Sequence, residues 1–473
     1  MLAGWKLHDR VLGPNDIVAP DERLSWARPL GLGAQHVVAM FGATFVFPLL
    51  MGLNAQLAIL MSGIATICFL LIVNGKVPSY LGSSASFVGA VAAVRAQGGE
   101  SSTVTRAILV CGVVLALVGI SIHFLGSGII HKALPPVVTL AVVMLIGFNL
   151  ATVVANVYWP QDQWVALLVM VFAIACAVEL RGFYGRISIF LALIFGTALS
   201  WVFDRIFGMN TSLDPGTGKI TTHWRVNWDS VTSASWIGFP PHTSMVAGKE
   251  IVGWHTPTLS MAAILLVLPA VIALIAENTG HVKAVAEMTG VNLDAVMGRA
   301  IAADGFGTIL ASSVGGSPTT TYAESIGVMA ATRVYSTAAY YAAALVAIVV
   351  GLSPKFGAVV AATPGGVLGG ITMILYGMIG LLGAKIWKEN DVDFANPINL
   401  VPVAAGIVIG IGNTTLVLSK TFSLSGIALG TMVAIAAYHM ARALAPQHMK
   451  DSADGAVLVV GGKDTDKEEL SVH

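Results

Sequence analysis

Two hydroxyl-rich stretches interrupt the apolar pattern of the sequence: Pro78-Ser-Tyr-Leu-Gly-Ser-Ser-Ala-Ser-Phe87 and Gly316-Ser-Pro-Thr-Thr-Thr-Tyr-Ala-Glu324. In both, a proline near the start is followed by small polar residues and then by a stretch of helical character. Both are too short and too polar for an ordinary membrane span, which needs about 20 apolar residues. Irregular backbone at membrane depth is tolerated only where it lines a cavity or is buried in protein. We therefore interpret them as broken membrane segments, which either lie beside a binding site or are kinked for packing reasons alone.

The composition of the whole chain is that of an all-α polytopic membrane protein. Of the 473 residues, 56% are hydrophobic and 11% are charged, and the mean hydropathy is +0.81. A soluble domain carries roughly 25% charged residues, so this chain lacks the polar side chains needed to cover a surface in water. The 25 basic and 25 acidic residues cancel, and the charge balance therefore indicates no nucleic-acid partner.

Apolar runs predict about fourteen membrane crossings. They lie near residues 29–50, 55–74, 78–96, 105–125, 133–153, 162–179, 187–206, 258–282, 297–313, 317–332, 335–353, 364–385, 397–413 and 424–443. The broken stretches are the third and tenth of these segments, which is the same position in two halves of seven segments. An odd number of crossings in each half gives the halves opposite orientations. Paired broken segments at matching positions point to the binding site of a transporter built from an inverted repeat.

Basic residues are unevenly distributed among the short loops, which predicts that both chain ends are cytoplasmic. The loops on the side of the N-terminus hold Lys6, Arg10, Arg23, Arg28, Lys76, Lys132, Arg181, Arg186, Lys283, Arg299, Arg333, Lys385, Lys388 and Arg442. The opposite short loops hold Arg95, Arg106, Lys355 and Lys420. On this topology residues 1–28 are a cytoplasmic segment, residues 207–257 are a long external loop, and residues 444–473 are a disordered cytoplasmic tail.

Five ionisable residues lie within the predicted spans: His36, Glu277, His281, Asp304 and Glu324. Each is costly in hydrocarbon, so each is a candidate for function. Glu277 and His281 are four residues apart and share one face of a helix. Burial favours the protonated carboxyl group, and a histidine one turn away can stabilise its charged form or relay its proton. The alternative is a structural hydrogen-bonded pair that ties two helices together.

The remaining candidates differ in how strongly they indicate a ligand. Glu324 begins the helical half of the tenth segment, where free backbone N–H groups favour a carboxylate, and a second acid beside a cavity is hard to explain as packing. Asp304 can support the tenth segment or join a proton path, and His36 reads mainly as an interhelical hydrogen-bonding residue. Three aromatic side chains near the breaks can stack on a planar ligand or simply pack: Phe87, Tyr322 and Tyr376.

The sequence resembles the nucleobase–ascorbate transporter (nucleobase:cation symporter-2) family, and within it the bacterial uracil permeases. Glu324-Ser-Ile-Gly-Val-Met-Ala-Ala-Thr-Arg333 is similar to the family signature of Gln, Glu or Pro, then Asn, any residue, Gly, four residues, Thr and a basic residue. Further matches are Gln35-His36 followed by Ala39-Met-Phe-Gly-Ala-Thr44, then Tyr80-Leu-Gly-Ser-Ser84, and Ala276-Glu-Asn-Thr-Gly-His281. The resemblance extends from about residue 25 to residue 440.

The resemblance implies a repeat of two inverted seven-span halves that builds two domains. Its core domain would comprise residues 29–125 (spans one to four) and 258–353 (spans eight to eleven). Its gate domain would comprise residues 133–206 and 364–443 and would form a homodimer. The family also implies a bacterial inner (plasma) membrane, membrane lipid as surroundings and a nucleobase as substrate.

The resemblance assigns roles to individual residues. Glu277 and Glu324 would grip the base, and His281 would support proton coupling. The broken segments would contact the ligand around Ser84, Ala85, Tyr322 and Ala323. Family members with Glu at the first signature position typically carry uracil, whereas those with Gln carry purines such as xanthine or urate.

Two departures from the family pattern bear on the substrate. The signature's Asn is replaced by Ser325, and the ring-bearing Phe that uracil permeases tend to carry after Ser-Ser is replaced by Ala85. Phe87 can take over the stacking, but it lies two residues further on. The pocket is therefore expected to be wider than a uracil site.

The function that the sequence predicts is import of uracil or a related pyrimidine by proton symport and alternating access, with the proton as coupling ion and no cofactor. The first alternative is a xanthine or urate symporter of the same family. A transporter of the sulfate or bicarbonate type fits less well, because two glutamates without a membrane-buried Arg or Lys make a negative site. Metal-ligand, nucleophile-elbow and phosphate-loop motifs are absent from the sequence, which argues against an enzyme.

Overall fold

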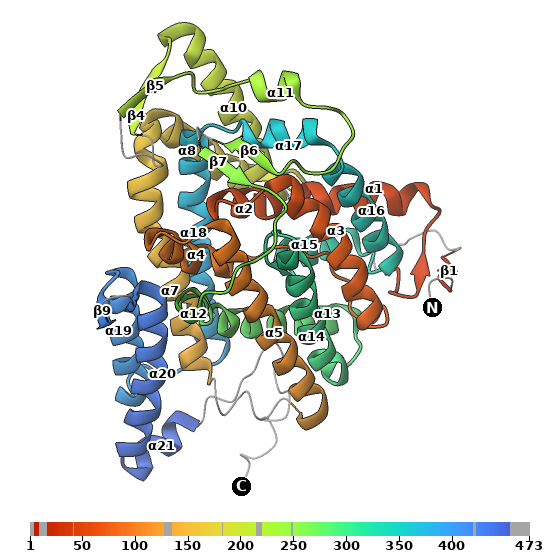
Figure 1. Cartoon of the computed structure of the whole chain (residues 1–473). Coiled ribbons are helices and arrows are strands. Elements are labelled where there is room, and N and C mark those ends of the chain that lie inside the picture. The colour runs from red at the N-terminus through yellow and green to blue at the C-terminus, as the bar shows by residue number, and fades with distance from the viewer. Residues whose placement is uncertain are drawn as a thin grey trace.

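The computed structural model describes residues 4–8, 17–40, 42–126, 135–181, 183–213, 220–246, 249–419 and 422–454, and helices dominate it (Figure 1). The first part of the chain contains β1 (Lys6–Leu7), β2 (Glu22–Arg23), α1 (Ala27–Ala39), a π-helical turn (Gly42–Val46), α2 (Phe47–Leu50), α3 (Ala55–Ile72), β3 (Gly82–Ser83), a 3-10 turn (Ala85–Phe87), α4 (Val88–Ala96), α5 (Ser101–Leu125), α7 (Pro136–Val153), a π turn (Val154–Tyr158), a 3-10 turn (Trp159–Gln161), α8 (Gln163–Glu179), α9 (Phe183–Arg186) and α10 (Ser188–Phe207).

The second part begins with short elements that precede the next long helix. These are β4 (Asn210–Leu213), β5 (Ile220–His223), α11 (Asp229–Ser233), β6 (Thr243–Val246) and β7 (Lys249–Val252). The remaining elements are α12 (Met261–Val267), α13 (Ala270–Thr289), α14 (Asp294–Ser313), β8 (Thr319–Thr320), α15 (Ala323–Thr332), α16 (Thr337–Gly351), α17 (Pro354–Ala361), α18 (Gly365–Glu389), α19 (Pro397–Ile411), β9 (Thr415–Ser419), β10 (Phe422–Ser425), α20 (Gly426–Leu444) and α21 (Gln447–Asp454). Helix α21 lies in the predicted tail, of which residues 455–473 are outside the described residues.

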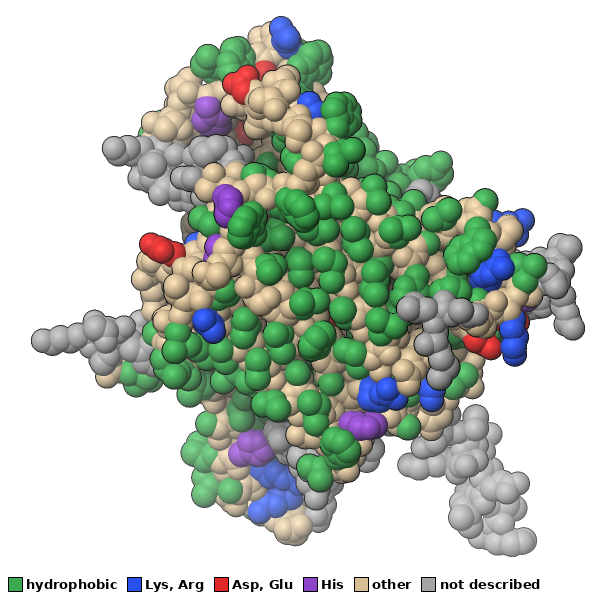
Figure 2. All heavy atoms as spheres, turned by 45° about the vertical axis from the view of Figure 1, so that its right-hand side comes forward, with side chains coloured by type: hydrophobic (Ala, Val, Ile, Leu, Met, Phe, Trp, Pro, Cys, Tyr) green, Lys and Arg blue, Asp and Glu red, His purple; other side chains and the backbone are tan. Residues whose placement is uncertain are grey.

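Several helices have the length and composition of membrane spans. Among the described residues seven are long and apolar enough, or up to nine if each of two bent helix pairs is one span. Three shorter apolar helices occupy the predicted third, sixth and thirteenth segments: Ala85–Arg95, Gln163–Glu179 and Pro397–Ile411. Hydrophobic side chains cover the broad middle of the face in Figure 2, and the charged ones lie toward its edges. The protein is therefore a multi-pass membrane protein, and the total of about fourteen crossings stays a prediction.

The helices pack in two groups (Figure 1). In the first group α14 packs on α5 and α3, while α16 packs on α3 and α1. In the second group α18 packs on α7, α8 and α10, while α19 and α20 pack on each other and on α7. The groups meet where α4 and α13 contact α7 and where α12 contacts α20.

Small residues allow α5 and α14 to approach closely. A Cβ atom on Gly119 would lie 2.2 Å from the backbone N of Ala302, and one on Gly298 would lie 2.4 Å from the backbone N of His123. Without a strong hydrophobic drive between helices in lipid, such close backbone contact is a main source of helix association.

Gly119→Ala is expected to lower the free energy of unfolding by about 1–3 kcal/mol, because the added methyl group would overlap backbone that has no room to move. Gly377→Ala is the matched control: it lies inside α18 with nothing within 4 Å of the added carbon. The control should be neutral or stabilise the protein by about 0.4–1 kcal/mol through reduced entropy of the unfolded chain. Thermal unfolding of both variants in detergent tests this, and equal melting temperatures would contradict the close packing of α5 on α14.

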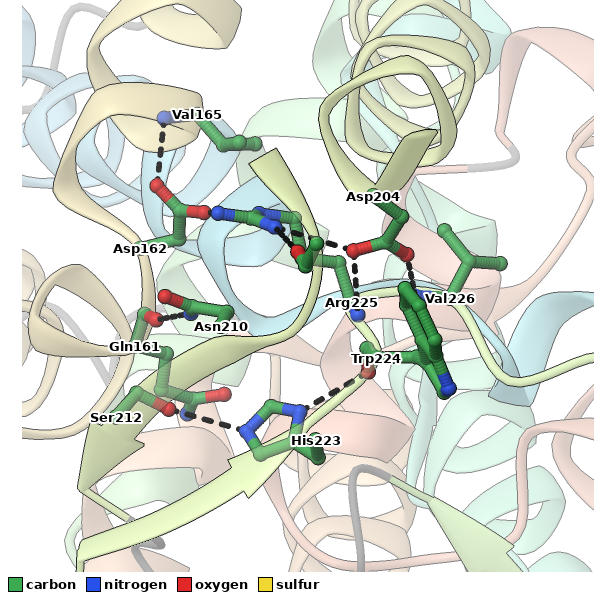
Figure 3. Close-up of polar contacts among 11 residues, drawn as sticks. Gln161, Asp162, Val165, Asp204, Asn210, Ser212, His223, Trp224, Arg225 and Val226 are labelled. Carbon is green, nitrogen blue, oxygen red and sulfur yellow. Dashed lines mark hydrogen bonds and ion pairs between the residues drawn. The ribbon is translucent and has the colours of Figure 1, made fainter. Parts of the chain in front are cut away.

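The predicted external loop is tied to both helix groups. Figure 3 shows Arg225 between two carboxylates, with its Nε 2.6 Å from Asp162 Oδ2 and its Nη1 3.1 Å from Asp204 Oδ1. Asp162 also caps α8, because its Oδ1 accepts from the Val165 N–H at 3.1 Å. Further along, the N–H of Gly238 donates to the Leu352 carbonyl at 2.9 Å, just after α16. The loop therefore runs from the second helix group to the first.

Candidate functional site

The two broken stretches meet at one place in the structure. Strands β3 and β8 pair in antiparallel register, Gly82 opposite Thr320 and Ser83 opposite Thr319. The pairing continues where the Ser84 N–H donates to the Pro318 carbonyl at 2.9 Å. Because these strands come from segments seven predicted spans apart, the chain joins its two halves at their broken segments.

Side chains strengthen this crossing. The hydroxyls of Ser83 and Ser317 hydrogen-bond to each other, and the Tyr322 hydroxyl donates to the Ser83 carbonyl. These contacts satisfy polar groups that are buried inside the protein.

A helix begins directly after each strand of the crossing. Ser84, with ψ 125, precedes the turn and helix that start at Ala85, and Tyr322, with φ −137 and ψ 139, precedes α15. The first N–H groups of a helix have no partner within it, and its N-terminus carries partial positive charge. The crossing therefore brings together two sets of backbone donors, which suits a ligand with carbonyl or anionic oxygens.

Hydroxyl groups of the neighbouring helices hold the broken backbone in place. From α3, Thr66 Oγ1 accepts from the Leu81 N–H at 2.9 Å, and Ser62 Oγ lies 3.0 Å from the Tyr80 hydroxyl. From α14, Thr308 Oγ1 donates to the Thr319 carbonyl at 2.9 Å. These three residues were missed in the sequence. The available signal was a hydroxyl residue on the helix preceding each break.

A hydrogen-bonded chain links the eighth, ninth and tenth segments. His281 Nδ1 lies 2.8 Å from Thr321 Oγ1, which donates to Asn278 Oδ1 at 3.0 Å. Asn278 Nδ2 in turn donates to Asp304 Oδ2 at 2.7 Å. Since the single hydroxyl proton of Thr321 goes to Asn278, the proton in the first bond belongs to His281 Nδ1. Two predicted proton-coupling residues, His281 and Asp304, are thus joined through Thr321 of the broken segment and Asn278 of α13.

Glu277 faces the other broken segment. It lies half-buried on α13, and its Oε2 accepts from Ser86 Oγ at 3.5 Å. Glu277 thus contacts the third segment, whereas His281, one turn away on the same helix, contacts the tenth. That Glu277 and His281 together hold the coupled proton stays a prediction.

The other predicted binding residues differ in their placement. Ser84 and Phe87 are fully buried, Tyr322 is nearly so, and Ala85 is half-buried at the start of its turn. Backbone geometry makes Ala323 and Glu324 the first two residues of α15, but their side chains lie outside the described part of the structure. Tyr376 is buried on α18, in the second helix group.

His36 on α1 contacts two other helices. Its Nδ1 lies 3.3 Å from Ser325 Oγ on α15, and its ring lies 4.5 Å from the Tyr340 ring on α16. The interpretation of His36 as an interhelical hydrogen-bonding residue is confirmed. Within the described residues no cluster of three or more His, Cys, Asp or Glu side chains is placed to hold a metal ion.

Comparison with known proteins gives relatives over most of the chain. The protein called "Putative pyrimidine permease RutG" from Escherichia coli (strain K12) is 42% identical over 426 residues, which cover 89% of this chain and 90% of that protein. The uracil permease of Bacillus subtilis (strain 168) is 31% identical over 458 residues, which cover 94% of this chain and 97% of that one.

Solved structures share the fold at low sequence identity. The transmembrane domain of the cyanobacterial bicarbonate transporter BicA gives a TM-score of 0.55 at 13% identity and covers 87% of this chain and 96% of that one. The murine anion transporter Slc26a9 gives a TM-score of 0.58 at 13% identity and covers 88% of this chain and 68% of that one. These likenesses concern the fold alone.

Matches over this length decide the family. Residues 29–419 match the permease family, and this range includes both broken stretches and the motif that starts at Glu324. The two relatives described above are named as pyrimidine and uracil permeases. The resemblance found in the sequence is therefore confirmed: the chain belongs to the permease family of nucleobase–ascorbate transporters.

Proposed function

We propose that the protein is a proton-coupled symporter that imports uracil or a related pyrimidine. The main observation behind this proposal is the crossing of β3 and β8. The turn at Ala85 and helix α15 both begin there, next to Glu277 and with Glu324 as the second residue of α15. The uracil and pyrimidine permeases that are similar to this chain support the choice of substrate class.

The chemistry of the crossing suits the edge of uracil. That base offers two N–H donors and two carbonyl acceptors, a carboxylate accepts from N–H, and a protonated carboxyl group can also donate. Free backbone N–H groups at the starts of the turn at Ala85 and of α15 can donate to a carbonyl oxygen. A site with two glutamates and two helix starts therefore suits the imide edge of uracil better than it suits an inorganic anion, because the anion would meet two negative groups.

We infer that the protein is an inverted repeat of two seven-span halves with a core of residues 29–125 and 258–353 and a gate of residues 133–206 and 364–443. Packing partners support this, because they recur after a shift of seven predicted spans. Helix α5 packs on α14, and their counterparts α16 and α3 also pack together. Likewise α8 packs on α18, and their counterparts α19 and α7 pack together. Helix α10 packs on α8, and their counterparts α20 and α19 also pack together.

Alternating access would then move the first helix group against the second. The contacts of α4 and α13 with α7 are where such movement would occur. Helix α4 follows the turn that begins at Ala85, and α13 carries Glu277 and His281. The distribution of basic residues supports cytoplasmic chain ends in a bacterial inner membrane, and the family resemblance supports a homodimer through the gate.

We place the coupled proton on Glu277 and His281, with Asp304 at the end of the hydrogen-bonded chain from His281. The chain through Thr321 and Asn278 supports this, because it connects the tenth segment to the buried acid Asp304. Protonation of His281 would alter its bond to Thr321 and hence the backbone next to the crossing.

Uptake of radiolabelled uracil and xanthine into proteoliposomes tests the proposal. We expect uracil uptake to rise as external pH falls and to collapse when a protonophore is added, with xanthine carried poorly. His281→Ala should impair proton-driven accumulation more than equilibrium binding, whereas His439→Ala, at an exposed position on α20, should change neither. Uptake that depends on sodium and ignores the protonophore would refute proton coupling, and preferential xanthine uptake would refute the pyrimidine assignment.

A further inference from the structure

Residues near the N-terminus form a parallel bridge to the junction between α15 and α16. The Val18 N–H donates to the Arg333 carbonyl at 3.0 Å, and the Tyr335 N–H donates to the Val18 carbonyl at 2.8 Å. The Thr337 N–H then donates to the Pro20 carbonyl at 3.1 Å. Segments more than 300 residues apart in the chain are thus joined backbone to backbone.

Side chains reinforce the same junction. Thr337 Oγ1 donates to the Pro20 carbonyl at 2.8 Å and accepts from Trp5 Nε1 at 2.8 Å. Ser336 Oγ donates to the Glu22 carbonyl. Because Thr337 is only 4% exposed, its two side-chain bonds are shielded from competition with water.

Apolar contacts complete the attachment. Val18, Leu24 and Val334 form a small buried cluster of their own. The Trp5 ring meets the rings of Trp26 and Tyr341 at centroid distances of 6.1 and 5.6 Å. We call Trp5 together with residues 17–24 the N-terminal clip.

The clip holds the helix whose other end forms the candidate site. Helix α15 has 10 residues, starts at the β3–β8 crossing and ends at Thr332. Arg333 follows in a left-handed conformation with φ 54, and its carbonyl is the one that Val18 binds. A helix of this length behaves as a short rigid rod of roughly 15 Å, so restraint at its end also fixes its start.

We infer that the N-terminal clip is a positioning element for the substrate site, which it orients by fixing the far end of α15. This inference rests on the proposed function for its ligand. The apparent affinity of a site falls in proportion to the fraction of molecules in which the site is correctly formed. One net hydrogen bond changes the equilibrium between correctly and incorrectly formed sites by a factor of roughly 2 to 12.

Thr337→Val tests the inference, because it keeps the side-chain shape and removes both hydroxyl bonds. We expect the Kd for uracil, measured by calorimetry, to rise about 3- to 10-fold, and backbone amides of α15 to exchange hydrogen faster by a similar factor in the ligand-free protein. Thr337→Ser should restore both values. The matched control is Thr197→Val, which removes a half-buried hydroxyl that donates to the Leu193 carbonyl of the same helix, α10, and it should change neither.

Trp5→Phe provides a second test, because it removes the donor to Thr337 and keeps an aromatic ring, although a smaller one, beside Trp26 and Tyr341. It should raise the Kd in the same direction, and the double variant should resemble Thr337→Val alone, because the two changes remove one shared bond. Unchanged α15 exchange in both variants would overturn the inference, as would a lowered melting temperature with unchanged Kd. If the unaltered protein fails to bind uracil, the proposed substrate is wrong, and the exchange of α15 still decides whether the clip holds that helix.

Discussion

Replacing Arg225 by methionine is expected to lower the free energy of unfolding by about 3–5 kcal/mol, the cost of breaking a buried ion pair by removing one partner. The Arg225, Asp162 and Asp204 side chains are 11%, 10% and 8% exposed. Without the guanidinium, the two largely buried carboxylates of Asp162 and Asp204 repel each other with no cation between them. The arginine also donates from Nη1 to the Gly208 carbonyl at 2.9 Å, so the variant loses a tie between the loop and the end of α10.

Arg205→Met is the matched control for this prediction. Arg205 is the residue after Asp204 in α10, is exposed to solvent and lies over the Trp201 ring at 5.4 Å. The same change of charge and shape at this position should shift stability by no more than about 0.5 kcal/mol. Combining Arg225→Met with Asp162→Asn and Asp204→Asn should recover part of the loss, because no unpaired charge then stays buried. Equal melting temperatures of Arg225→Met and Arg205→Met in detergent would show that the triad contributes nothing.

The sequence alone predicts the meeting of the broken segments but not what supports them. Proline, glycine and hydroxyl residues at matching positions of two halves place both broken segments at one binding site, but they do not predict that the segments pair as the strands β3 and β8. The supporting role of Thr66 and Thr308 is hidden, because a Ser or Thr inside a helix often bonds a carbonyl of its own helix. Thr105 does so, donating to the Ser101 carbonyl at 3.0 Å, and the residue type alone does not distinguish these cases.

Partners of charged residues are equally hard to predict when they are distant in sequence. Arg225 is 63 residues from Asp162 and 21 from Asp204. Asp162 precedes α8, Asp204 lies within α10, and Arg225 lies in the loop between β5 and α11. Only the folded chain brings them together. The external loop therefore appears in the sequence as a polar stretch without a role, although the structure ties it to α8 and α10.

Helix periodicity has a similar limit at the candidate site. The spacing of Glu277 and His281 correctly places both on α13 one turn apart. It does not reveal that Glu277 meets Ser86 while His281 meets Thr321, because the spacing describes one helix and not the segments packed against it. Asn278, which joins Thr321 to Asp304, lies inside the same motif and was overlooked because an amide carries no charge.

Glu277→Gln and Glu324→Gln are each expected to weaken uracil binding by about 1.5–3 kcal/mol, the range for hydrogen bonds to a charged group. An amide keeps one acceptor oxygen but replaces the other with a donor, so one N–H of the base would face an N–H of the protein. For Glu277 the described contact with Ser86 places the carboxylate next to the turn that begins at Ala85. For Glu324 the argument is its position as the second residue of α15, directly after the crossing.

Calorimetric titration with uracil and with xanthine separates the two residues. The uracil Kd should rise roughly ten- to a hundred-fold in either variant. Glu324→Gln should lose less affinity for xanthine than for uracil, because the family resemblance associates Gln at this position with purine carriers. Glu179→Gln, at an exposed position at the end of α8, is the matched control and should bind both bases as the unaltered protein does. Unchanged uracil affinity in Glu324→Gln would place the base away from α15, and then the pairing of the broken segments would serve packing rather than recognition. A loss confined to Glu277→Gln would instead leave recognition to α13 and the turn at Ala85, with the helix start at α15 contributing backbone donors only.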